Sequence, residues 1–471
     1  MLAERLIMDG RWPTILALWA SVLGWAGCRP DRGLQEGRSV APALSNIVLI
    51  TIDTIRADRL GCYGYFRDTT PEIDRFAKEC ILFERCLAPM ATTLPAHTSI
   101  LTGTYPIEHG VLANVAHGGL PFQRSPRLRS LAEVASQAGY LTAAFVSAAP
   151  LKRGTGMESG FQEFDQPILR ERSARDTNER VFTWLEARST EPYLLWVHYY
   201  DPHTPYEPPP PYDTMFQTDQ RQQAYLAERR FVSHPAGKRG YPRSAAKINN
   251  RYDGEIRYVD SQVGRLLERL RSLETWDRTV VVLVGDHGQS VWQHGEGYHG
   301  SIHDEQLHVP LLIRKPGIAG RRFAAVVSAV DLPATLIGLI EGFPADEFLE
   351  QTSGRNVLAE GFEPTPVFSH QSHRKRDDRP FPTYALTSGQ WKYVHQIGGT
   401  DRLYHLSRDP HELHDVLPDH LQLAAELRAQ VLSMIAQQSA KAAAYQGGRA
   451  DPPEPLDPAV LEQLRSLGYV E

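Results

Sequence analysis

Four continuous apolar runs, separated by helical patterns, constrain the fold of this chain more than any other feature. The runs are NIVLITID at 46–53, TAAFVSA at 142–148, YLLWVHYYD at 193–201 and TVVVLVGD at 279–286. Apolar runs of this length are typical of parallel strands that are buried on both faces. Helical patterns lie between them, at 70–79, 127–139, 177–188 and 255–273. The alternation predicts an α/β protein with a layered sheet and right-handed crossovers.

Three of these predicted strands end in an aspartate: Asp53, Asp201 and Asp286. Ligands of open α/β sheets bind outside the carboxyl ends of the strands, so we expect the three carboxylates at one edge. His287 follows Asp286 directly. Two carboxylates and an imidazole from separate strand ends can bind a divalent metal ion, and the alternative is a set of solvated turn residues. The pair Asp53 and Asp286 favours the metal site.

The length and composition allow one large core, or a large domain with a smaller one, because 42% of 471 residues are hydrophobic. The net charge of −6 gives no support to nucleic-acid binding. After about residue 363 the pattern changes to short alternating strands and then a helix at 420–444. We therefore predict a main α/β domain at 45–363 and a C-terminal subdomain at 364–471, with antiparallel strands and a helical tail. The segment 206–250 is predicted to be a long loop or lid.

The N-terminal segment is predicted to direct export. The apolar run TILALWASVLGWAGC ends at Cys28 and fits the apolar region of a signal peptide at 1–28. WAGC resembles a bacterial lipobox, with tryptophan where leucine is usual, so Cys28 is the predicted lipidation site. An ordinary signal peptide is the alternative. Residues 29–44 are predicted to be a flexible tether. We expect a protein of the bacterial cell envelope, in the periplasm or at the outer membrane, that contacts membrane only through its lipid anchor.

Cysteine usage does not require disulfides. Without Cys28 the chain has Cys62, Cys80 and Cys86. An odd number cannot pair completely, so one bridge with a remaining thiol and three separate thiols both stay open.

A pair of threonines opens the helical pattern TTLPAH at 92–97. Pro95 is typical of a first helical turn, which puts Thr92 or Thr93 at or near the N-cap. One interpretation is capping alone. The other is a hydroxyl nucleophile beside the metal, with helix N–H groups facing the anionic oxygens of a substrate.

Nine segments of the chain together form one recognisable pattern. They are NIVLITIDTIRADRLGCYGY, TTPEIDRFAKECILFERC, TLPAHTSILTGTYPIEHGV, WVHYYDPHTPY, YDGEIRYVD, VVVLVGDHGQ, HVPLLIRKPG, VDLPATL and LYHLSRDPHE. In these segments and their order the chain resembles the sulfatase branch of the alkaline-phosphatase-like superfamily. The resemblance extends over roughly residues 45–415 and implies a three-layer α/β/α sandwich with a smaller antiparallel-sheet subdomain. It also implies a metal-dependent hydrolase that acts on ester bonds.

The chain departs from this family at the nucleophile. Sulfatases carry a cysteine or serine nine residues before a Thr-Gly pair, which here is at 102–103, and oxidise it to formylglycine. This chain has Thr93 at that place and His97 at the place of the family's arginine. Cys86 does not substitute, because its proline comes one residue too late. Threonine cannot become formylglycine.

A threonine at this place resembles the nucleotide pyrophosphatase/phosphodiesterase branch instead. That branch has a phosphate-contacting asparagine at a position that matches Asn114, although Ala96 departs from its pattern. The two resemblances imply roles for eight residues. Metal ligands are Asp53, Thr93, Asp286 and His287; catalytic residues are Thr93, His203 as general acid and His299; substrate-binding residues are Asn114 and His97. Arg56, Asp58, His294 and Lys392 are expected to be structural.

We expect one divalent metal ion, with zinc or manganese favoured over calcium because His287 stands where calcium-type relatives have asparagine. A second metal, held by Asp201, His203 and His299, stays open, since the Asp-x-x-x-His pair of two-zinc relatives is absent.

The predicted reaction is hydrolysis of a phosphoester, either a monoester or a diester. A formylglycine hydrate can expel sulfate by reverting to the aldehyde, whereas a threonyl ester must be attacked by water. The alternatives are a sulfatase proper, a phospho-group transferase and a non-catalytic binding protein. The partner is expected to be a small-molecule, glycan or lipid ester, and the oligomeric state stays open.

Overall fold

The computed structural model describes residues 45–168, 171–187, 191–231, 244–371 and 382–446. The predicted signal peptide with Cys28, the tether at 29–44 and the end of the C-terminal subdomain lie outside these residues. Within them, no helix is both long enough and apolar enough to cross a membrane.

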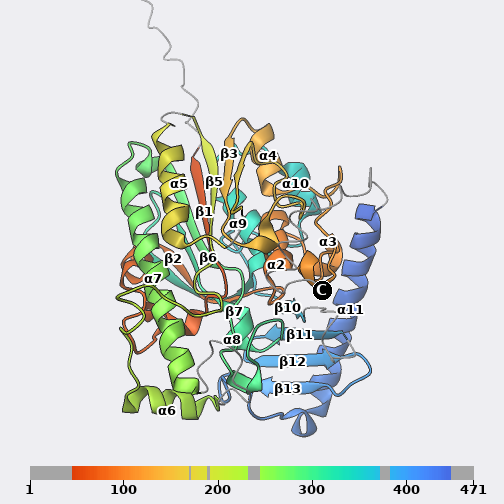
Figure 1. Ribbon diagram of the computed structural model, residues 1–471. Helices are drawn as coiled ribbons and strands as arrows, with labels where there is room; N and C mark the ends of the chain where they lie inside the picture. The colour runs from red at the N-terminus through yellow and green to blue at the C-terminus, as the bar shows by residue number, and fades with distance from the viewer. Residues whose placement is uncertain (1–44, 169–170, 188–190, 232–243, 372–381, 447–471) are drawn as a thin grey trace, which may run out of the picture. The chain divides into compact units, whose positions relative to one another are not determined.

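The main sheet has nine strands in the order β4-β3-β5-β1-β6-β8-β2-β7, and β9 pairs with β2 (Figure 1). The four predicted strands are β1, β3, β5 and β6, and they pair in parallel at the centre of the sheet. Strands β7 and β8 run antiparallel to their neighbours, so the sheet is mixed. The bounds are β1 (Asn46–Ile52), β2 (Ile81–Leu87), β3 (Leu141–Phe145), β4 (Glu163–Asp165), β5 (Tyr193–Tyr199), β6 (Thr279–Gly285), β7 (His308–Val309), β8 (Leu311–Arg314) and β9 (Arg321–Ser328).

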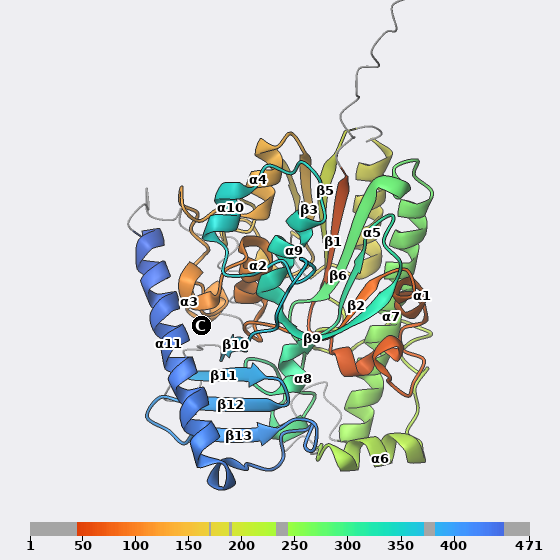
Figure 2. The ribbon, with the colours of Figure 1, turned by 180° about the vertical axis from the view of Figure 1, so that it is seen from behind.

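Helices cover both faces of this sheet, as Figures 1 and 2 show from opposite sides. Side chains of β1 alternate between the two layers: Ile47 and Leu49 pack with α2, α4 and α9, whereas Val48 and Ile50 pack with α1, α5 and α7. Both faces are buried, which explains why β1 is apolar without interruption. The bounds are α1 (Pro71–Ala77), α2 (Thr93–Thr102), α3 (Pro106–His109), α4 (Leu131–Gln137), α5 (Ala174–Glu186), α6 (Gln220–Glu228), α7 (Ala245–Arg271), α8 (Asp304–Leu307), α9 (Leu332–Gly338) and α10 (Asp346–Gln351).

A separate antiparallel sheet follows, in the order β10-β11-β12-β13. Its bounds are β10 (Val367–His370), β11 (Thr383–Ser388), β12 (Trp391–Gln396) and β13 (Arg402–His405). The long helix α11 (Leu421–Gln446) packs along it through Leu427 and Val431. The structure thus confirms the predicted fold class, a layered α/β sandwich with a second, antiparallel sheet.

Two expectations change in detail. The segment 206–250 is not only a loop, because it contains α6 and the first turn of α7. Cys62, Cys80 and Cys86 are free thiols, which settles the question that the cysteine count left open.

Candidate active site

The carboxyl ends of β1 and β6 bring two of the predicted ligands together. The strands are parallel and in register, with Ile52 beside Gly285, so the residues that follow, Asp53 and Asp286, are neighbours. Two backbone N–H groups orient the carboxylate of Asp286 through Oδ1. Thr54 donates to this oxygen at 3.1 Å, and His287, the next residue, donates to it at 2.6 Å. The other oxygen of Asp286, Oδ2, is therefore the one turned away from these backbone donors.

The residues around this point fit a divalent cation. Both oxygens of Asp53 and Oδ2 of Asp286 are buried and have no hydrogen-bond partner within the described part of the chain. Burial and the charge of Asp286 raise the pKa of Asp53, and burial raises the pKa of Asp286. Two such carboxylates are costly to bury without a counter-charge, which a metal ion would provide.

The imidazole of His287 completes this donor set. Its Nδ1 lies 2.9 Å from the carbonyl of Gly288. Because a carbonyl only accepts, Nδ1 carries the hydrogen, and Nε2 of the neutral ring has the lone pair. Nε2 lies 3.4 Å from Oδ2 of Asp286 and 3.7 Å from Oδ1 of Asp53. This is the tautomer that a metal-binding histidine needs.

Only one of the two adjacent threonines reaches this cluster. Thr93 is the first residue of α2, is 2% exposed, and has its Oγ1 3.5 Å from Nε2 of His287. Thr92 is the N-cap, but its hydroxyl donates to the carbonyl of Ala91 at 2.8 Å and makes no cap bond. Successive residues of a starting helix point in directions about 100° apart, so the two hydroxyls cannot share one site.

Asn114 caps the helix in place of Thr92. Its Oδ1 accepts the N–H of Leu94 at 2.9 Å, and its side chain is 2% exposed. The side chain of Asn114 therefore lies next to the start of α2, where we expect it to contact the substrate.

His97 lies beneath the start of α2, where both ring nitrogens are engaged within the protein. Nδ1 donates to the carbonyl of Thr93 at 2.8 Å, and Nε2 accepts from the hydroxyl of Thr51 at 3.0 Å. That hydroxyl in turn accepts from the indole of Trp196 at 2.9 Å. Burial lowers the pKa of His97 to about 4, so the ring is neutral. This geometry corrects the predicted role, because His97 supports Thr93 and has no nitrogen left for a substrate.

A histidine that the sequence analysis did not assign lies at the centre of the site. His198 in β5 is fully buried, and its Nε2 is 3.8 Å from Oδ2 of Asp53. The backbone N–H of Ser147 donates to its Nδ1 at 3.3 Å, so Nε2 carries the hydrogen in the neutral ring. His198 is thus a donor beside Asp53. The strand register shows why His198 lies there. His198 pairs with Thr51 across β1 and β5, and Thr51 lies on the same face of β1 as Asp53.

His299 lies next to His287, and His203 is in ring contact with His299. Nδ1 of His203 is 2.7 Å from the hydroxyl of Tyr200 and 2.6 Å from the carbonyl of Thr204. Nδ1 of His299 donates to the carbonyl of Ala91 at 2.9 Å. The ring of His299 is 4.4 Å from that of His287 and 5.5 Å from that of His203, between ring centres. The structure therefore brings His299 to the side of the metal ligands and His203 to the side of His299.

Asp201 follows β5 at the same edge of the sheet, as predicted, but its carboxylate does not join Asp53 and Asp286. Its Oδ2 accepts the N–H of Ala174 at 2.8 Å, at the start of α5. A helix N-terminus offers unpaired donors that compete well for a carboxylate. Among the described residues, no group of metal ligands contains Asp201, His203 and His299, so the second metal that was left open has no support here.

The four residues expected to be structural form ion pairs. Arg56 and Asp58 form a salt bridge at 2.7 Å, which fits the structural role expected of them. His294 donates to Glu305 at 2.9 Å. Burial alone would lower the pKa of His294, but the contact with Glu305 raises this pKa to about 9. Lys392 of β12 is buried between Asp304 and Glu412, at 2.7 Å from each.

Comparisons with known proteins identify the family of the chain. Residues 45–343 match the protein family Sulfatase. Arylsulfatase K of Bos taurus is 29% identical over 204 residues, which are 40% of this chain and only about a third (36%) of that protein. Uncharacterized sulfatase YidJ of Escherichia coli (strain K12) is 24% identical over 431 residues, 79% of this chain and 83% of that protein.

Solved structures share the fold. The phosphonate monoester hydrolase of Agrobacterium radiobacter has a TM-score of 0.65 and 24% identity, covering 84% of this chain and 96% of that one. The relatives that these names describe are ester hydrolases, and enzymes of this family are metal-dependent. Since the family match covers more than half of its length, the chain belongs to the sulfatase family.

Proposed function

We propose that the protein is a metal-dependent phosphoester hydrolase with Thr93 as its nucleophile. The observation that carries the proposal is the position of the Thr93 hydroxyl, 3.5 Å from Nε2 of His287, where sulfatases carry formylglycine. A threonine keeps a simple hydroxyl, which can form an ester with the transferred group and release it only by hydrolysis. The phosphonate monoester hydrolase among the structural neighbours supports a phosphorus ester as substrate.

One divalent ion is held by Asp53, Asp286, His287 and Thr93 in this proposal. When bound, it supplies positive charge that favours the deprotonated hydroxyl and offsets the charge of the phosphoryl oxygens. Zinc or manganese suits the mixed nitrogen and oxygen donors better than calcium does.

The residues of the chain carry out two displacements. First, Oγ1 of Thr93 forms a bond to phosphorus, the bond from phosphorus to the leaving oxygen breaks, and the hydroxyl proton passes to water. His203 donates a proton to the leaving oxygen, which departs as an alcohol, and His203 regains its proton from solvent. Water then bonds to phosphorus, the bond to Thr93 breaks, and the threonine oxygen takes a proton from that water. Asn114 orients the phosphoryl oxygens through its side-chain N–H₂ group, and His299 does so as an imidazolium through Nε2–H, because its Nδ1–H donates to Ala91.

The test is a comparison of Thr93→Ala, Thr93→Ser and Thr92→Ala with wild type on four aryl esters: a phosphate monoester, a phosphate diester, a phosphonate monoester and a sulfate. We expect Thr93→Ala to lower kcat about 10³-fold or more while metal content stays the same. Thr93→Ser should keep measurable activity, because a hydroxyl survives. Thr92→Ala is the matched control and should lose at most about 1 kcal/mol of stability, because within the described residues its hydroxyl hydrogen-bonds only to the carbonyl of Ala91.

When turnover of a phosphate ester is stopped rapidly, the peptide that contains Thr93 should carry a phosphate group. Full activity of Thr93→Ala would exclude this nucleophile. A sulfate ester that turns over faster than every phosphorus ester would favour a sulfatase proper over our proposal.

A further inference from the structure

The turn directly after Asp53 has a backbone conformation that its sequence does not favour. Thr54 has φ of 51°, in the left-handed region that β-branched residues rarely adopt. The same residue donates its N–H to Oδ1 of Asp286. The strained turn therefore connects the two carboxylates of the metal site, and any relaxation would move one relative to the other.

A single side chain holds both ends of this turn. The hydroxyl of Tyr252, on α7, donates to the carbonyl of Thr54 at 2.6 Å and accepts the N–H of Arg56 at 3.3 Å. Tyr252 is fully buried. Without its hydroxyl, a buried carbonyl and a buried N–H would lose this partner, which is a large penalty for a short turn. Strained residues persist only where such contacts over-determine them.

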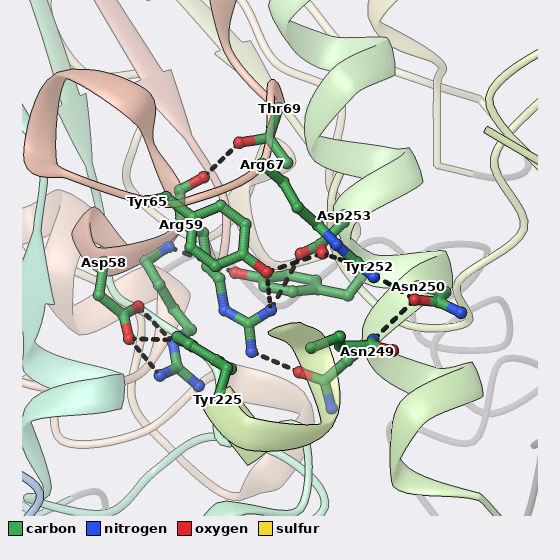
Figure 3. A network of polar contacts seen from close by, with 12 residues as sticks. Asp58, Arg59, Tyr65, Arg67, Thr69, Tyr225, Asn249, Asn250, Tyr252 and Asp253 are labelled. Atoms are coloured by element: carbon green, nitrogen blue, oxygen red, sulfur yellow. Dashed lines mark hydrogen bonds and ion pairs between the residues drawn. The ribbon is translucent and has the colours of Figure 1, made fainter. Parts of the chain in front are cut away.

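A network of polar contacts surrounds the part of α7 next to Tyr252, as Figure 3 shows. The next residue, Asp253, binds Arg59 at 2.9 Å, Arg67 at 2.6 Å and the hydroxyl of Tyr65 at 2.8 Å. Arg59 and Asp253 are both fully buried. These contacts bind one helical turn of α7 to the segment that follows β1. We infer that the Tyr252 hydroxyl is held in place independently of the backbone turn at Thr54.

We propose that Tyr252 is a positioning residue of the metal centre: its hydroxyl keeps Thr54 in the left-handed conformation and so keeps the Asp53 and Asp286 carboxylates aligned for one cation. This inference rests on the metal site of the proposed function, although it does not depend on the substrate. Within the described residues, the hydrogen bonds of the Tyr252 hydroxyl go to Thr54 and Arg56, so we infer that it acts through the turn.

The experiment measures zinc and manganese affinity directly by calorimetry, without substrate. Tyr252→Phe should weaken metal binding about tenfold, and saturating metal should restore kcat close to wild type. Tyr445→Phe is the matched control, because it also removes a buried hydroxyl that donates to a backbone carbonyl at 2.6 Å, that of Gln351, outside the site. Its metal affinity should equal that of wild type.

A second comparison, of Thr54→Gly with and without Tyr252→Phe, distinguishes positioning of the turn from a general loss of stability. It can be made even if Tyr252→Phe alone does not fold. Glycine adopts a left-handed conformation freely, so in the Thr54→Gly background removal of the Tyr252 hydroxyl should change metal affinity less than twofold. A large loss in that background, or unchanged affinity of Tyr252→Phe itself, would overturn the inference. A wild type that binds no metal would instead overturn the proposed function.

Discussion

At the scale of single residues, hydrogen-bond partners decide which histidine is a ligand. His287 and His198 both approach Asp53, at 3.7 and 3.8 Å. The carbonyl of Gly288 fixes the hydrogen of His287 on Nδ1, whereas the N–H of Ser147 fixes that of His198 on Nε2. One ring therefore presents a lone pair to the site and the other presents an N–H.

We expect His287→Asn to lower zinc and manganese affinity at least about tenfold and to shift the preference towards calcium, because it removes the only nitrogen ligand. His198→Asn is the comparison and should leave the order of metal preference unchanged, even if the protein becomes less stable. Metal titrations of both variants check this. A shift of preference in His198→Asn without one in His287→Asn would mean that the two tautomers are assigned the wrong way round.

At the scale of elements, the start of α2 has two functions that mutation can separate. Asn114 accepts the N–H of Leu94 through Oδ1, and its amide N–H₂ group is the part that we propose to contact the substrate. The helix of ten residues also directs its N-terminal dipole towards this point. Loss of the cap should affect stability, and loss of the amide should affect catalysis.

We expect Asn114→Ala to lower the free energy of unfolding by about 1 kcal/mol and to lower kcat/KM as well. Asn114→Asp should keep the cap, because a carboxylate accepts the same N–H, but should lose activity because its charge repels a phosphoryl group. Ser130→Ala removes the equivalent cap of α4, the bond from the N–H of Glu133, and should cost similar stability with full activity. Full activity of Asn114→Asp would exclude the substrate contact. Denaturant unfolding and steady-state kinetics measure both properties.

At the scale of the whole described molecule, an ion pair joins the antiparallel sheet to helix α8 of the main domain. Lys392 of β12 binds Asp304 at the start of α8, and Glu412 accepts the N–H of the same residue, Asp304, at 2.6 Å. His294 and Glu305 lie in the same region. Breaking a buried pair leaves an uncompensated charge, so this region should set the stability of the whole fold.

The pair of His294 and Glu305 predicts a pH dependence with a definite sign. The pKa of His294 is about 9 in the folded protein and 6.5 as its ordinary value. Because the folded value is the higher one, the pair's stabilisation is complete below pH 6.5 and is lost as pH rises to about 9. The difference in unfolding free energy between wild type and His294→Gln should shrink by roughly 2–3 kcal/mol over this range. A difference that stays constant from pH 6 to pH 9.5 would contradict the assignment.

The sequence by itself determined the layered α/β class, the four central strands and the pair Asp53 and Asp286, because uninterrupted apolar runs and strand-end acids are local patterns. It also pointed to Thr93 over Thr92, through a count of residues from the Thr-Gly pair. The tertiary structure alone decided which polar groups meet. Strand register brought His198 to Asp53, a helix N-terminus drew Asp201 away, and Thr51 and the carbonyl of Thr93 occupied both nitrogens of His97. These outcomes depend on competition between hydrogen-bond partners distant in sequence, and no local pattern encodes that competition.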